Sequence, residues 1–205
     1  MGGASLTRIG IIVGTKGRGS NMRAIAEACA DKELDAVVAV VFSPASESQA
    51  VENARALGLE VAVFDPKSES AEETLIDIGK RYELDLICLA GYMRLIPTEF
   101  VKRFENAILN IHPALLPNFG GKGMYGMKVH EAVLASGDKQ SGATVHFVNE
   151  RYDEGAVFHQ ITCEVLPHDT PESLAARVLS VEHRCYVEAI RKWIANRQSA
   201  RNASL

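Results

Sequence analysis

The stretch Ile9-Gly10-Ile11-Ile12-Val13-Gly14-Thr15-Lys16-Gly17-Arg18-Gly19-Ser20-Asn21 decides the fold. Its first five residues are short, apolar and mostly β-branched, and a glycine follows them, which predicts a strand buried on both faces. After the glycine-rich turn, residues 22–30 predict a helix with Ile25 and Ala28 on its inner face. A buried strand, a turn and a helix in succession are typical of α/β proteins.

The rest of the chain repeats this order of elements. Strands are predicted at 36–42, 60–64, 85–90 and 107–111, and the helices between and beside them at 49–57, 71–82 and 98–104. Then come a helix, two strands and a long amphipathic helix, at 130–136, 142–148, 157–165 and 170–195. We therefore expect one Rossmann-like α/β domain, with a mostly parallel central sheet, helices on both faces and a long C-terminal helix.

Composition favours a single globular domain. Of the 205 residues, 47% are hydrophobic and 23% are charged, which is typical of globular proteins. The net charge of −4 gives no general attraction to nucleic acid or anionic membranes. One domain is expected over 1–205, with residues 1–6 and 198–205 poorly ordered.

The cysteines and the length of the apolar segments bear on the cellular compartment of the protein. Four cysteines are scattered without a C-x-x-C pair, so neither a metal cluster nor a disulfide framework is expected. The sequence has no apolar run of membrane-spanning length, and its start lacks the layout of a signal peptide. We predict a cytoplasmic protein without metal, membrane or nucleic-acid partners.

The glycine-rich turn at 17–21 predicts a phosphate site. Glycines let the backbone approach a ligand, and a helix N-terminus offers free N–H groups and the positive end of a dipole. Ser20 and Asn21 add polar side chains, while Lys16 and Arg18 favour an anion. The spacing matches neither nucleotide-binding glycine motif, so a glycine turn with helix capping is the structural alternative.

The segment Asn110-Ile111-His112-Pro113 predicts a catalytic pair. Asn110 and His112 alternate with apolar residues, so a strand places both side chains on one side, at the edge where α/β sheets bind ligands. An amide stabilises a carbonyl oxygen that gains negative charge, and an imidazole moves protons near neutral pH. Asp153, in a polar turn, is a candidate partner that would raise the pKa of His112. The alternative is a buried polar pair beside an ordinary turn residue.

These segments occur together, in this order, in one known family. The chain resembles the phosphoribosylglycinamide formyltransferases (glycinamide ribonucleotide transformylases) of the folate-dependent formyltransferase superfamily, from Ile9 to about Ala195. The string Asn-Ile-His-Pro-x-Leu-Leu-Pro is specific to the superfamily, and the Gly-Ser-Asn turn narrows the resemblance. It rests on residues 17–21, 89–96, 109–117, 143–148 and 153–155.

The resemblance implies a reaction. The formyl group of 10-formyltetrahydrofolate, a co-substrate, passes to the amine of 5-phosphoribosylglycinamide, which gives formylglycinamide ribonucleotide and tetrahydrofolate in de novo purine biosynthesis. Asn110 would polarise the formyl carbonyl, His112 would be the general acid, and Asp153 would raise its pKa. No metal is implied, and the protein would be a monomer or homodimer that binds only small molecules.

The resemblance also implies two binding sites. Gly19, Ser20 and Asn21 would hold the ribotide phosphate, and Glu182 would contact its ribose. The pterin pocket would be lined, together with Asn110, by Met93, Arg94, Leu95 and Ile96.

Two departures and several rivals stand beside this interpretation. The loop at 118–126 differs from the family's usual sequence, and Lys122 is either a replacement contact or a solvated side chain. Near Lys67 the family often supplies an arginine, and none is present. Among the rival formyl-folate enzymes, methionyl-tRNA formyltransferases and formyltetrahydrofolate hydrolases are expected to have a further domain, and sugar-nucleotide formyltransferases are expected to be longer. A Rossmann-like redox or binding protein is a rival of another class, and the glycine spacing disfavours it. The sequence leaves the role of His146 open.

Overall fold

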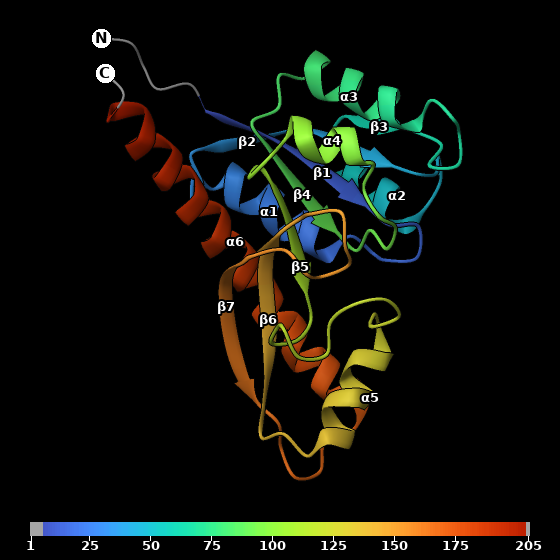
Figure 1. Cartoon of the computed structure of the whole chain (residues 1–205), viewed down its shortest axis with the longest axis vertical. Coiled ribbons are helices and arrows are strands. Elements are labelled where there is room, and N and C mark those ends of the chain that lie inside the picture. The colour runs from blue at the N-terminus through green and yellow to red at the C-terminus, as the bar shows by residue number, and fades with distance from the viewer. Residues whose placement is uncertain (1–5, 204–205) are drawn as a thin grey trace. The chain divides into compact units, whose positions relative to one another are not determined.

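A computed structural model describes residues 6–203 (Figure 1). The described part of the chain contains seven strands and six helices. The described chain divides into two compact units, of which the first comprises residues 6–92 and 187–203 and the second residues 93–186. The α/β fold predicted from the sequence is confirmed.

The first unit contains four parallel strands. They are β1 (Thr7–Val13), β2 (Ala36–Ser43), β3 (Val61–Val63) and β4 (Leu86–Ala90), with β1 between β2 and β4 and β3 beyond β2. Every residue of β4 is buried. Continuous apolar runs such as these form strands that are covered on both faces, as the sequence predicted.

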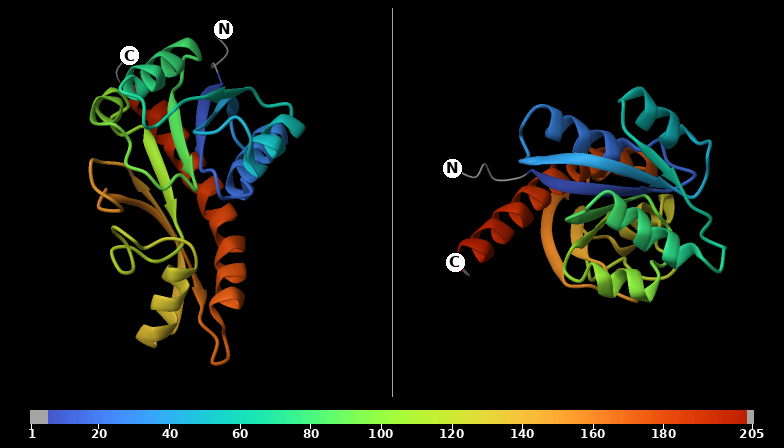
Figure 2. Two further views of the ribbon diagram at one scale, coloured as in Figure 1. Left: turned by 90° about the vertical axis from the view of Figure 1, so that its right-hand side faces the viewer. Right: turned by 90° about the horizontal axis from the view of Figure 1, so that it is seen from above.

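Three helices connect these strands. They are α1 (Ser20–Ala30), α2 (Gln49–Ala56) and α3 (Ala71–Arg81). Figure 2 shows α1 and α2 on one face of the four strands and α3 on the other. Right-handed crossovers require this arrangement, because the chain moves outward from β1 to β3 and then returns to place β4 on the opposite side of β1.

β1 and β4 are close together where they end. Val13 pairs with Ala90, and the glycine after each strand continues the contact. A Cβ atom on Gly14 would lie 2.0 Å from the carbonyl oxygen of Gly91, which is a fixed main-chain atom. Only glycine fits at position 14, so the start of the 14–19 turn is fixed by packing against the end of β4.

The second unit has an antiparallel core. Its strands β5 (Ile108–His112), β6 (Gln140–Phe147) and β7 (Val157–Glu164) pair in sequence order, and its helices include α4 (Thr98–Arg103) and α5 (Met127–Ser136). Buried Val133 of α5 packs with Leu174 and Val178. The helix α5 is thereby fixed within this unit.

The last helix, α6, runs over Pro171–Asn202. In the second unit Tyr186 donates a hydrogen bond to the carbonyl oxygen of Leu109 in β5, at 2.9 Å. In the first unit Arg197 forms an ion pair with Asp85, at 2.7 Å. Residues 198–202, which the sequence predicted to be poorly ordered, continue the helix, whereas residues 1–5 and 204–205 lie outside the described part of the chain.

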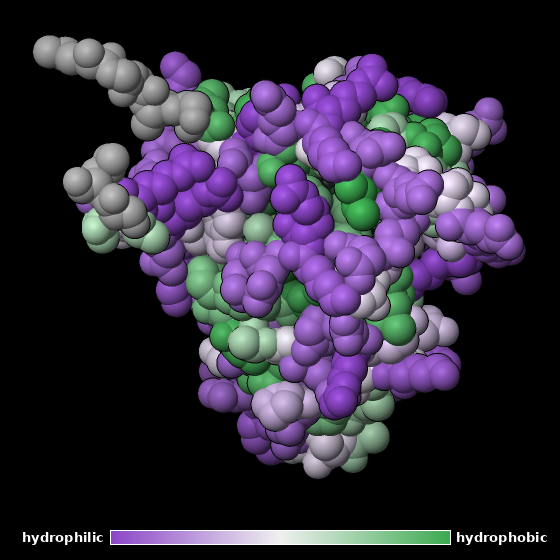
Figure 3. Space-filling model, turned by 45° about the horizontal axis from the view of Figure 1, so that its top comes forward, coloured by the Kyte–Doolittle hydropathy of each residue, from purple (hydrophilic) through white to green (hydrophobic). Residues whose placement is uncertain are grey.

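The surface is mixed in character. On the face shown in Figure 3, hydrophilic residues predominate and separate the hydrophobic ones into small groups. Within residues 6–203, no helix combines the length and the apolar character that are needed to cross a membrane.

We expect Gly14→Ala to lower the free energy of unfolding by about 1–3 kcal/mol, the usual cost of overpacking, because the new methyl group would overlap the Gly91 carbonyl oxygen. The measurement is urea unfolding followed by circular dichroism. Gly17→Ala is the matched control, since its Cβ would be 3.9 Å from the nearest atom. Equal stability of the two variants would contradict the proposed packing constraint.

Candidate active site

The end of β5 carries the predicted pair. Asn110 and His112 lie on the same face of β5, and His112 is the last residue of the strand. In the adjacent β6, His146 is opposite Asn110 and Thr144 is opposite His112. Side chains opposite each other in an antiparallel pair share one face of the sheet, so four polar side chains are gathered at this place.

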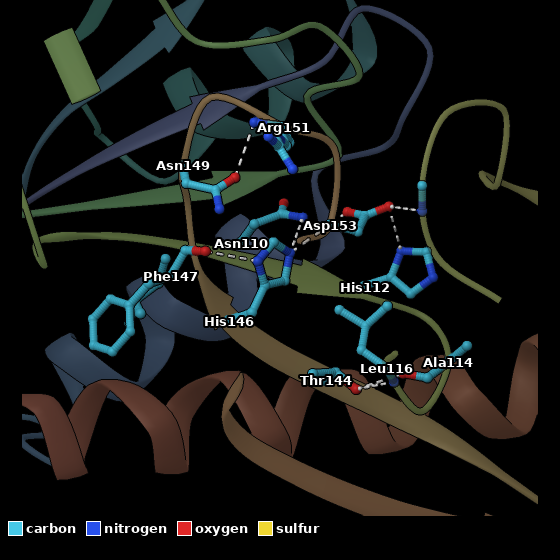
Figure 4. A network of polar contacts seen from close by, with 12 residues as sticks. Asn110, His112, Ala114, Leu116, Thr144, His146, Phe147, Asn149, Arg151 and Asp153 are labelled. Carbon is cyan, nitrogen blue, oxygen red and sulfur yellow. Dashed lines mark hydrogen bonds and ion pairs between the residues drawn. The ribbon is translucent and has the colours of Figure 1, made fainter. Parts of the chain in front are cut away.

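His146 is hydrogen-bonded at both ring nitrogens. Its Nδ1 lies 2.8 Å from the carbonyl oxygen of Phe147, and its Nε2 lies 3.0 Å from Nδ2 of Asn110. Figure 4 shows the imidazole between these two groups. A fixed imidazole therefore supports the Asn110 amide.

His112 is held by the loop that follows its own strand. Its Nε2–H donates to the carbonyl oxygen of Phe119, at 2.8 Å. Its Nδ1 lies 3.5 Å from Oδ2 of Asp153. The ring is almost completely buried, so its charge state depends strongly on these two neighbours.

Asp153 reaches the two histidines from the turn between β6 and β7. Its Oδ2 accepts a hydrogen bond from the Gly121 N–H at 3.0 Å, and its Oδ1 lies 3.5 Å from Nε2 of His146. Asp153 has a φ of 55°, in the left-handed region that aspartate tolerates better than most residues. One carboxylate thus faces both imidazoles, and the structure brings Asn110, His112 and Asp153 together.

Gly155 lets this turn fold back against β6. A Cβ atom on Gly155 would lie 1.7 Å from the carbonyl oxygen of Phe147. The pairing of β6 with β7 also shifts register between Val145 and His146, and such bulges re-aim side chains beside functional sites. The Asp153-x-Gly155 pattern therefore has a structural reason, because the glycine permits the approach that places the aspartate.

The charges of the pair are set by competing effects. Burial lowers the pKa of His112 below its ordinary value, although the Asp153 carboxylate and the hydrogen bond to Phe119 act in the opposite direction. Burial tends to raise the pKa of Asp153, but its contacts with His146, His112 and Gly121 outweigh that effect and leave it below its ordinary value. The sequence led us to expect a protonated His112. Asp153 does act in that direction, yet the net shift favours the neutral ring because desolvation is larger.

A second polar network holds the segment after β5. The hydroxyl of Thr144 donates to the carbonyl oxygen of Ala114 at 2.6 Å and accepts from the Leu116 N–H at 3.0 Å. Gln160 of β7 donates to the Leu116 carbonyl oxygen, at 2.9 Å, and to the Thr144 hydroxyl, at 2.8 Å. These bonds fix the course of residues 113–117, which lead into the glycine-rich loop.

The glycine-rich loop contributes main-chain groups to the site. The Phe119 carbonyl accepts from His112, and the Gly121 N–H donates to Asp153. A Cβ atom on Gly120 would be 2.4 Å from a Leu116 side-chain atom. Lys122, a candidate contact in the sequence, has an exposed side chain.

The predicted phosphate turn lies in the first unit. Helix α1 begins at Ser20, two residues earlier than predicted, so Ser20 and Asn21 belong to its first turn. Gly19 precedes it with a φ of 74°, a conformation that favours glycine. Asn53 of α2 donates to the Arg18 carbonyl oxygen at 2.7 Å. The turn is thus fixed to α2, with the N–H groups of the first helical turn at its end.

The other predicted binding residues differ in exposure. Met93, Arg94 and Leu95 are exposed, whereas Ile96 is buried. Glu182 lies on α6, with its side chain partly buried. Met93 and Leu95 therefore present apolar side chains at the surface.

An amide, an imidazole and a carboxylate at the end of a strand are groups that can together stabilise an oxyanion and move a proton. The chain belongs to the formyl transferase family, whose sequence model matches residues 9–190.

The names of its relatives specify a substrate in addition to the formyl transferase family. A chloroplastic phosphoribosylglycinamide formyltransferase of Arabidopsis thaliana is 46% identical over 185 residues, which cover 88% of this chain and 63% of that protein. The phosphoribosylglycinamide formyltransferase of Escherichia coli is 34% identical, over 91% of this chain and 87% of that one. The crystal structure of the Brucella melitensis phosphoribosylglycinamide formyltransferase matches with a TM-score of 0.83 and 40% identity, over 92% and 95% of the two chains. The chain spans less than two thirds of the plant protein's length.

We expect Asp153→Asn to lower the pKa of His112 further, because the carboxylate raises that pKa in the native site. The asparagine oxygen can still accept from the Gly121 N–H, so the turn should be retained. NMR titration of the His112 ring protons measures the shift, with Asp138→Asn, an exposed aspartate in the loop after α5, as the control. An unchanged or higher pKa in Asp153→Asn would contradict the electrostatic role assigned to this carboxylate.

Proposed function

We propose that this protein transfers the formyl group of 10-formyltetrahydrofolate to the amine of 5-phosphoribosylglycinamide, a step of purine biosynthesis. The observation that carries the proposal is the grouping of Asn110, His112 and Asp153 around the end of β5. The names of the relatives support the choice of substrates.

The chemistry divides among these residues. The substrate amine attacks the formyl carbon and creates a tetrahedral oxyanion, towards which Nδ2 of Asn110 donates a hydrogen bond. A protonated His112 delivers a proton to the departing folate nitrogen as the C–N bond breaks, and the attacking amine gives up a proton of its own. Asp153 stabilises the imidazolium in this step, and it helps to relay protons through water.

The shifted pKa of His112 suits this role. Since burial opposes its charge, the buried imidazolium gives up its proton more readily than one in water. The ionised Asp153 acts against this shift and favours the charged form of His112. The substrate's own amine is the nucleophile, so no Ser or Cys nucleophile is needed. Asn110 and the protonated His112 stabilise the oxyanion in this proposal, without a metal.

Separate segments bind the two substrates in this proposal. The ribotide phosphate takes hydrogen bonds from Gly19, Ser20 and Asn21 at the start of α1, where free N–H groups favour an anion, and Glu182 contacts the ribose. The pterin of the folate covers the exposed side chains of Met93 and Leu95 and bonds to the main chain of 93–96.

The remaining parts of the proposal concern the state of the protein. We propose that it is a monomer or homodimer in the cytoplasm and that its ligands are small molecules. The plant relatives carry names that place them in chloroplasts.

The decisive experiment mixes purified protein with 10-formyl-5,8-dideazafolate and follows loss of the formyl group by absorbance, with and without the ribotide. Turnover should require the ribotide and yield formylglycinamide ribonucleotide. His112→Ala should retain the circular dichroism spectrum and lose about 10²-fold or more in kcat, as expected for a general acid. Formyl loss that is independent of the ribotide would contradict the transferase and favour a hydrolase.

A second measurement tests the phosphate turn. Asn53→Ala removes the hydrogen bond to the Arg18 carbonyl and should raise the KM for the ribotide about 2- to 10-fold, the worth of one hydrogen bond, with little effect on the KM for folate. Glu52→Ala is the control, since it alters an exposed side chain of the same helix that hydrogen-bonds with Gln49. An equal rise in both KM values would argue against a ribotide site at this turn.

A further inference from the structure

We propose that His146 is a positioning residue for the reaction, and that it fixes the orientation of the Asn110 amide. This inference rests on the proposed function for its catalytic consequence, although its structural part does not depend on any activity. His146 is 2% exposed and lies directly opposite Asn110 in the pairing of β5 with β6.

The Phe147 carbonyl determines which nitrogen of His146 carries hydrogen. A carbonyl oxygen only accepts hydrogen bonds, so the His146 Nδ1, at 2.8 Å from it, must be the donor. The oxygen belongs to the main chain and is fixed by the Phe147 N–H, which donates to the Ala156 carbonyl, and by the close approach of Gly155. The neutral ring is therefore the tautomer with hydrogen on Nδ1.

This tautomer determines the orientation of the amide. In a neutral imidazole that is protonated at Nδ1, Nε2 has a lone pair and accepts. The amide atom of Asn110 at 3.0 Å from Nε2 is then the NH₂ group, and the amide oxygen faces away. One N–H of Nδ2 is held by His146, while the second stays available to donate to the formyl oxygen.

The Asp153 carboxylate does not reverse this arrangement. Its Oδ1 is 3.5 Å from His146 Nε2, beyond the normal range of a hydrogen bond, whereas Asn110 is at 3.0 Å. A proton on Nε2 would require Asn110 to turn its oxygen towards the ring. The two histidines consequently have different tasks: His146 holds the Asn110 amide through its Nε2, and His112 exchanges protons.

Two substitutions of His146 separate its two contacts. The amide nitrogen of an asparagine occupies the place of Nδ1 and keeps the bond to Phe147, but it leaves Asn110 without an acceptor. The amide oxygen of a glutamine occupies the place of Nε2 and accepts from Asn110. We expect His146→Asn to lower kcat about tenfold or more, with KM values changed less than about threefold, and His146→Gln to recover much of the lost kcat. His168→Asn, at an exposed histidine, is the control and should keep the native kcat.

A double-mutant cycle tests whether His146 acts through Asn110. If it does, His146→Asn should have little further effect on kcat in an Asn110→Ala background, because coupled residues are not additive. A full and independent loss in that background would overturn the proposal, as would native kcat in His146→Asn.

The tautomer is measurable without any substrate. In the ¹⁵N-labelled native protein, long-range ¹H–¹⁵N NMR at neutral pH should show hydrogen on Nδ1 of His146 and a lone pair on Nε2. Hydrogen on Nε2 would overturn the proposal. If the native protein fails to transfer formyl to the ribotide, the proposed function fails while this spectrum still decides the orientation of Asn110.

Discussion

The pairing of β5 with β6 is the constraint on which the rest of the second unit's site depends. Because the strands are antiparallel, the register that sets Asn110 against His146 also sets His112 against Thr144. A slip of one residue would turn these side chains to the other face of the sheet. The hydrogen bond from Tyr186 to the Leu109 carbonyl holds β5 from the side of α6. One register therefore supplies the amide, its support, the imidazole and the hydroxyl that holds the following loop.

Burial strengthens the electrostatic interactions among these polar groups, and it also makes their charged forms costly. Desolvation lowers the pKa of His112, so one carboxylate is needed to keep the charged form within reach. That carboxylate faces two imidazoles, at 3.5 Å from each. Two cations beside one anion in a buried site would be costly. The Phe147 carbonyl accepts from Nδ1 of His146, so a neutral His146 ring presents its lone pair to Asn110 and holds the amide without carrying a charge itself.

Much of this arrangement could be predicted from the sequence. The order of strands and helices followed from buried β-branched runs, and the alternation of Asn110 and His112 correctly placed both on one face. The contribution of His146 did not follow, because it depends on the register between strands that are more than 30 residues apart. The contacts of the Phe119 carbonyl and the Gly121 N–H could not be predicted for another reason. Nearly every residue has these main-chain groups, so the residue types do not reveal which of them form hydrogen bonds. The net direction of the His112 pKa depends on burial, which a motif does not measure.

Because its contacts are made by main-chain groups, the loop at 118–126 can depart from the family's usual sequence while the site retains these contacts. The loop supplies a carbonyl to His112 and an N–H to Asp153, and every non-proline residue can provide both groups. The loop depends instead on the course of its backbone. Hydrogen bonds from Thr144 and Gln160 to Ala114 and Leu116 fix the segment before it. Glycine is needed at position 120, because a side chain there would meet Leu116. We therefore expect substitutions in the exposed part of the loop to leave the bonds to His112 and Asp153 intact. A change at Thr144 should disturb both bonds together, because the Thr144 hydroxyl holds the segment that leads into the loop.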